Sequence, residues 1–71
     1  IMETLHRVSK DTYVAVEPAA NNWVHTRLMH GKERPHPIYK AVYACPAKEL
    51  SNVLDRARNY DHNVWGADED Y

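Results

Sequence analysis

The side chains in this sequence best suited to chemistry are its five histidines and its single cysteine. His30 and His36 flank a short polar loop and could converge. His25 and His30 would point to opposite faces of a regular strand, because they are an odd number of residues apart. A zinc site needs three or four ligands supported by further hydrogen bonds, and the chain contains no C-x-x-C or H-E-x-x-H pattern. We therefore expect no bound metal and interpret the histidines as surface groups.

A catalytic Cys–His pair can be drawn from Cys45 with His30 or His36 as its base. Cys45 precedes a predicted helix, whose N-terminus would lower the thiol pKa. However, the two glycines form no phosphate-cradling loop, and no nucleophile elbow or paired-carboxylate spacing occurs. A domain of this size also has little depth for a catalytic cleft. We expect a protein that is not an enzyme and that uses no cofactor.

Length and composition indicate one small intracellular domain. A chain of 71 residues buries only about 60% of its unfolded surface, so its core must be thin. The single cysteine excludes an internal disulfide, no apolar run is long enough to cross a bilayer, and the start lacks the order of a secretion signal. A net charge of −1 argues against a general polyanion binder. We expect a cytoplasmic protein without a membrane partner.

The two ends of the chain carry separate expectations. Ile1 stands before Met2, so we expect Ile1 to be a cloning remnant within a single domain that spans residues 1–71. Residues 66–71 form an acidic tail. As the simpler alternative, this tail is a solvated terminus that aids solubility. As the functional alternative, it acts with Trp65 as an aromatic and acidic segment that docks on a basic groove.

The clearest periodic pattern predicts a helix over residues 46–60. Leu50, Val53, Leu54 and Ala57 follow the i, i+3, i+4, i+7 spacing of one helical stripe. Pro46 suits the first helical position, where its missing N–H would have no intrahelical partner. Four segments before this helix resemble strands: residues 4–9, 12–17, 23–30 and 38–44. We predict an α+β fold, with a three- to four-stranded antiparallel sheet and one C-terminal helix packed on one face.

Alternation with a period of two divides the strand side chains between two faces. The helix-facing side is predicted to carry Val14, Val16, Val24, Leu28, Ile38 and Val42. The opposite side is predicted to display Tyr13, Trp23, His25, Arg27, Met29, Tyr39 and Tyr43. A small domain rarely leaves such a patch in water without a purpose. Tyrosine, tryptophan, methionine and arginine are enriched in protein interfaces, so we expect these residues to bind another protein.

Other occupants of that face stay open at this point. Trp65 and the tail could fold over it, or two copies of the chain could form a homodimer through it. A nucleic-acid-binding module is the alternative function, with aromatic rings stacking on bases and with the loop 31–37 contributing. Its expected phosphate contacts are Arg27, Lys32, Arg34 and Lys40.

In size and composition the chain is similar to the compact accessory or inhibitor proteins made by phages and other mobile elements, although no motif carries this likeness. The resemblance implies a protein that acts by covering a site on a larger host protein. The sequence therefore predicts a small binding protein, an inhibitor or accessory factor, that works by protein–protein contact.

Overall fold

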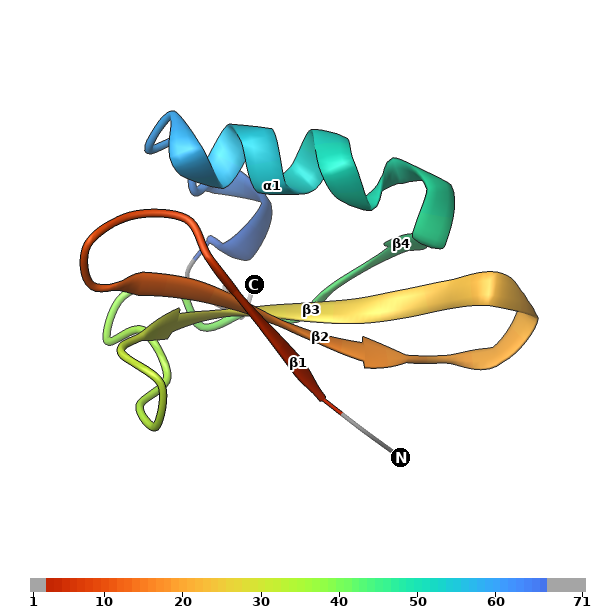
Figure 1. Ribbon diagram of the computed structural model, residues 1–71, viewed down its shortest axis with the longest axis horizontal. Coiled ribbons are helices and arrows are strands. Elements are labelled where there is room, and N and C mark those ends of the chain that lie inside the picture. The colour runs from red at the N-terminus through yellow and green to blue at the C-terminus, as the bar shows by residue number, and fades with distance from the viewer. Residues whose placement is uncertain (1–2, 67–71) are drawn as a thin grey trace, which may run out of the picture.

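The computed structural model describes residues 3–66, so Ile1 and the acidic tail from residue 67 onward lie outside the described part. Four antiparallel strands form one sheet in the order β1-β2-β3-β4 (Figure 1). Their bounds are β1 Thr4–Arg7, β2 Thr12–Pro18, β3 Trp23–His30 and β4 Tyr43–Pro46. The α+β architecture predicted from the sequence is confirmed.

The helical layer lies near the C-terminal end and on one side of the sheet (Figure 1). A 3-10 turn, η2 (Ala47–Glu49), leads into α1 (Leu50–Arg58), and a further 3-10 turn, η3 (Asn63–Trp65), follows. The predicted helix over residues 46–60 is therefore shorter as a true α-helix. Tyr60 has a φ of 60°, a left-handed conformation that cannot continue a right-handed helix. Within residues 3–66, no helix is long and apolar enough to cross a membrane.

The β2–β3 hairpin turns through a short 3-10 segment, η1 (Ala20–Asn22). Asn21 and Asn22 both have φ values near 60°. Asparagine tolerates this left-handed region better than most residues, which is why the A-A-N-N stretch can reverse the chain here. The hairpin then holds β2 and β3 in register along their full length, from Thr12 opposite His30 to Pro18 opposite Val24.

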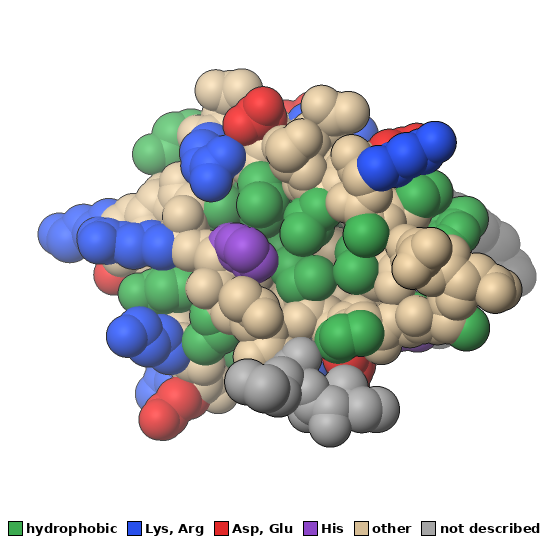
Figure 2. All heavy atoms as spheres, turned by 45° about the vertical axis from the view of Figure 1, so that its right-hand side comes forward, with side chains coloured by type: hydrophobic (Ala, Val, Ile, Leu, Met, Phe, Trp, Pro, Cys, Tyr) green, Lys and Arg blue, Asp and Glu red, His purple; other side chains and the backbone are tan. Residues whose placement is uncertain are grey.

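The core lies between α1 and the sheet. The aliphatic side chains predicted for this interface at Val14, Val16, Val24 and Leu28 are buried, and so are Val53, Leu54 and Ala57 from the helix. Val8, Cys45 and Trp65 complete the cluster. Hydrophobic side chains are still visible at the centre of the side shown in Figure 2, as expected for the thin core of a short chain.

The prediction for the fourth strand is wrong in its position. Ile38 and Val42 were expected in the core, but they are 61% and 56% exposed. Residues 34–36 occupy the free edge of the second half of β3, where the N–H of His36 donates to the Leu28 carbonyl at 3.0 Å. Pro35 and Pro37 then remove two N–H donors that a continuous strand would need. The chain loops outward over residues 37–42 and rejoins the sheet at Tyr43.

Candidate functional site

One face of the sheet is left without a helical cover in the described residues 3–66, since α1 and η3 both lie on the other side (Figure 1). Burial alternates strictly along the first six residues of β3, with Val24, Thr26 and Leu28 buried. The odd-numbered residues of β3 therefore point away from the helix. With their neighbours in register, they form a surface that we refer to as the open face: Leu5, Arg7, Tyr13, Ala15, Glu17, Trp23, His25, Arg27 and Met29.

Five of the seven residues predicted to bind a partner lie on the open face: Tyr13, Trp23, His25, Arg27 and Met29. Tyr39 and Tyr43 do not, and their predicted placement is wrong. Tyr43 pairs with Thr26, whose side chain faces the helix, and both tyrosines pack against the hydrophobic core. The strand starts at Tyr43 instead of Ile38, so its alternate residues can face the opposite sides from those predicted. A shift of one residue moves every side chain to the other face of the sheet.

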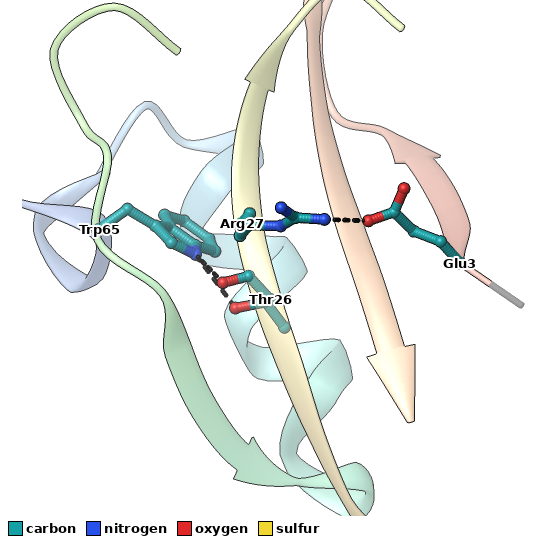
Figure 3. A network of polar contacts seen from close by, with 4 residues as sticks. All are labelled: Glu3, Thr26, Arg27 and Trp65. Atoms are coloured by element: carbon teal, nitrogen blue, oxygen red, sulfur yellow. Dashed lines mark hydrogen bonds and ion pairs between the residues drawn. The ribbon is translucent and has the colours of Figure 1, made fainter. Parts of the chain in front are cut away.

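The centre of the open face is crossed by an ion pair. The guanidinium of Arg27 on β3 reaches over β2 to the carboxylate of Glu3, just before β1 (Figure 3). Ala15 lies between them in register, flanked by Leu5 and Arg27, and is only 1% exposed. At the centre of the open face, Ala15 is thus covered by its neighbours, and the Arg27 guanidinium is already paired with a carboxylate.

Sequence reasoning missed four members of this face, Leu5, Arg7, Ala15 and Glu17, and it missed Glu3 as the partner of Arg27. The V-A-V alternation of β2 contained the signal for Ala15, because Val14 and Val16 were both assigned to the core. No local signal predicts the Glu3–Arg27 contact, which joins two residues 24 positions apart through the pairing of three strands.

The four cations predicted to meet phosphates do not form one surface in the arrangement described here. Arg27 belongs to the open face, whereas Lys40 lies on the outward loop over residues 37–42. Lys32 and Arg34 line an open hollow of about 410 Å³, and they share it with acidic groups. The full lining is Asp11, His30, Gly31, Lys32, Glu33 and Arg34. The mixed charge of this hollow weakens its attraction for a polyanion.

A second concentration of functional side chains lies where the loop after β3 meets the C-terminal segment. His36 is within 6.0 Å of His30 and 5.9 Å of His62, measured between ring centroids. We refer to His30, His36, Tyr39, Tyr60, His62 and Trp65 as the histidine cluster, since each ring lies near another of the set. His6, His36 and His62 are partly buried, whereas His25 and His30 are exposed, so the expectation that the histidines are surface groups is wrong for three of the five.

The histidine cluster has no metal-binding arrangement. Among residues 3–66, no three histidine, cysteine, aspartate or glutamate side chains lie close enough together to hold an ion. His62 was not considered in the sequence prediction of converging histidines, because only the tertiary fold brings it beside His36.

Cys45 is a core residue of β4 rather than an accessible thiol. It is buried, and burial raises its thiol pKa, with the Glu49 carboxylate adding to the increase. The sequence-based expectation of a lowered pKa is therefore wrong. Burial is the main cause, and a 3-10 turn that contains Glu49 also separates Cys45 from the start of α1. A protonated, buried thiol is a poor nucleophile.

Comparisons with protein-family models, with curated proteins and with solved structures find no significant match.

Proposed function

We propose that this chain is a small non-enzymatic binding protein that docks another protein across its open face. The observation that carries the proposal is Trp23, which is 44% exposed at one end of a sheet face that α1 does not cover. Tryptophan and arginine are the residue types most enriched among binding hot spots. Trp23 stands on the same strand face as His25 and Arg27, so a partner would meet a large ring beside polar groups.

The dimensions of the face suit a protein partner. Trp23 and Met29 mark its two ends along β3, and six residues of strand span roughly 20 Å. Interfaces of standard size bury about 800 Å² on each partner, which corresponds to a patch of similar breadth. Tyr13 lies opposite Met29 in register and adds a second aromatic ring at the far end.

The pattern of charge favours a protein over a nucleic acid as the occupant. Arg27 is paired with Glu3, and Glu17 stands directly opposite His25 on the same face. A surface that alternates cations and anions can complement the mixed charges of a protein surface, whereas phosphates would be repelled by its carboxylates. We propose that the chain acts as an inhibitor or accessory factor that covers a site on a larger protein.

The test uses a photo-activatable phenylalanine derivative placed at position 23 in cells that express the chain. The matched control carries the same group at Asn52, an exposed position on the outer side of α1. We expect position 23 to give a crosslinked adduct with a different protein, position 52 to give none, and Arg27→Glu to remove the adduct from position 23.

Three outcomes would overturn the proposal. An adduct with the mass of two chains would make the open face a homodimer interface, and a nuclease-sensitive adduct would make it a nucleic-acid surface. Equal yields from positions 23 and 52 would mean that contact there is not specific. The nucleic-acid outcome would also predict retention on an oligonucleotide column that falls steeply with salt.

A further inference from the structure

His36 holds the outward loop over residues 37–42 through its own side chain. Its Nδ1 atom accepts hydrogen bonds from the backbone N–H groups of Ile38, at 3.1 Å, and Tyr39, at 3.3 Å. Its backbone N–H meanwhile donates to the Leu28 carbonyl on β3 at 3.0 Å. One residue thus fixes the start of the loop to the sheet, in a stretch where two prolines have removed N–H donors.

The two contacts at Nδ1 require a neutral imidazole. A ring nitrogen that accepts a hydrogen bond cannot carry a proton, so the proton of neutral His36 belongs on Nε2. If Nδ1 is protonated, the N–H groups of Ile38 and Tyr39 lose their shared acceptor and face a competing donor. The bonds that fix the loop are therefore lost when His36 becomes charged.

The surroundings of His36 oppose that charge. Burial lowers the pKa of His36, and the neighbouring His62 and His30 rings lower it further. The Tyr39 ring is 5.2 Å from both His36 and His62, measured between ring centroids. Asp61 is next to His62 in the chain, and its pKa is held down by hydrogen bonds from the Arg56 side chain and from the backbone N–H of Asn63.

Titratable groups near His36 come from three parts of the chain. They are His30 at the end of β3, Tyr39 in the loop, and Tyr60, Asp61 and His62 after α1. Asp11, Lys32, Glu33 and Arg34 line the hollow that His30 borders. The Nε2 atom of His62 is buried and has no hydrogen-bond partner among the described residues.

We propose that the histidine cluster makes the loop over residues 37–42 a pH-sensitive element, held against the sheet when His36 is neutral and released when it is protonated. Release exposes the Tyr39 ring, which now packs against the core. The element is separate from the open face, so it does not depend on the proposed function.

The direction of the effect follows from the lowered pKa of His36. Above its ordinary pKa of about 6.5, His36 is neutral in both the held and the released loop, and the hydrogen bonds contribute fully. As the pH falls below about 6.5, the released loop binds a proton first. The population of the held state relative to the released state then falls by up to about tenfold for each pH unit, until the pH reaches the lower pKa of His36 in the held loop.

The experiment measures amide hydrogen exchange at Ile38 and Tyr39 by NMR at pH 7.5 and pH 5.5, corrected for the intrinsic pH dependence of exchange and with a chelator present. In the wild type we expect the protection of these two amides to fall by up to about tenfold at the lower pH. His36→Asn should abolish this dependence, because its amide oxygen can accept the same bonds and does not titrate. His6→Asn, which removes a histidine of β1 that belongs to neither the histidine cluster nor the open face, should leave the dependence unchanged.

A second measurement, on the wild-type protein, tests the proposal even if the variants fold poorly. The ¹⁵N shifts of His36 at pH 7.5 report which ring nitrogen carries the proton, and we expect Nε2. Protonation at Nδ1, protection that does not change with pH, or an equal pH dependence in His36→Asn would each overturn the proposal.

Discussion

The two faces of the sheet differ although one strand supplies both. Along β3, Val24, Thr26 and Leu28 are buried under the helical layer, whereas Trp23 and His25 on the alternate positions are exposed. The helix-covered face is mostly aliphatic and holds the domain together through burial of apolar area. The open face is aromatic and charged, and Trp23, His25 and Arg27 on it are exposed. We therefore expect substitutions at these exposed positions to change stability less than substitutions at the adjacent buried positions.

The two tryptophans sharpen the contrast. Trp65 is 0% exposed, and its indole N–H donates to the Thr26 carbonyl and hydroxyl at 3.2 and 3.0 Å (Figure 3). Trp23 presents nearly half of its surface to solvent. The same residue type thus completes the core on one side of the sheet and is available for contact on the other.

Replacement of Trp65 is expected to have the largest effect. Trp65→Ala removes a fully buried ring and its two hydrogen bonds, and should lower the free energy of unfolding by about 3–5 kcal/mol. Trp23→Ala should change it by about 0.5 kcal/mol or less. Urea unfolding followed by circular dichroism measures both. Trp65→Phe serves as a milder variant if the alanine protein does not fold. A loss for Trp23→Ala as large as that for Trp65→Ala would mean that the open face is covered.

A buried position of β3 and an exposed position of the loop over residues 37–42 give the next comparison. Leu28→Ala should cost about 2–5 kcal/mol, because it leaves a cavity under the helix. Ile38→Ala deletes a similar volume from an exposed loop position and should cost about 0.5 kcal/mol or less at pH 7.5. Thermal unfolding distinguishes them, since 1 kcal/mol corresponds to about 4–8 °C for a domain of this size. Similar losses for both would restore Ile38 to the core, as the sequence alone suggested.

The sequence predicts the helix and the strands of this fold more accurately than the loop and the register that connect β3 to β4. The stripe from Leu50 to Ala57 and the alternation of β3 are local patterns, so the helix and the buried positions Val24 and Leu28 follow directly from them. The register of β4 is not local, because it depends on how the loop after β3 is held by His36. After that loop, alternate residues of β4 face the opposite sides from those predicted, and Tyr43 lies on the helix side.

The same reasoning explains which site residues were found. Trp23, His25 and Arg27 follow from alternation within one strand. The histidine cluster could not be predicted, because His36 and His62 meet only after α1 has turned the chain back over the sheet. The alternative in which Trp65 folds over the open face is wrong, because Trp65 lies in the core on the helix side and bonds to Thr26, 39 residues away.

Thr26 offers a smaller and more specific perturbation of the covered face. Its hydroxyl donates to the Tyr43 carbonyl at 2.9 Å and accepts from the Trp65 indole. Thr26→Val keeps the shape but removes both contacts, and should cost about 1–3 kcal/mol. Thr4→Val, at an exposed position of β1, is the matched control and should be nearly neutral. An equally neutral Thr26→Val would show that the hydroxyl bonds contribute nothing to joining β4 and η3 to the core.

The smallest effect is expected for the Glu3–Arg27 pair, and it tests whether the open face is independent of stability. Both side chains are substantially exposed, so Glu3→Gln should lower the free energy of unfolding by about 0.2–1 kcal/mol at low salt. The difference from wild type should shrink at 1 M salt, where screening extends only about 3 Å. A loss above this range that persists in salt would mean that the pair stabilises the sheet by holding β1 across β2. A small, salt-sensitive loss would instead mean that Arg27 can leave Glu3 at little cost. A carboxylate of a partner could then replace that of Glu3. Arg27, which suits recognition of a partner on the open face, would therefore need little free energy to leave its contact within the chain.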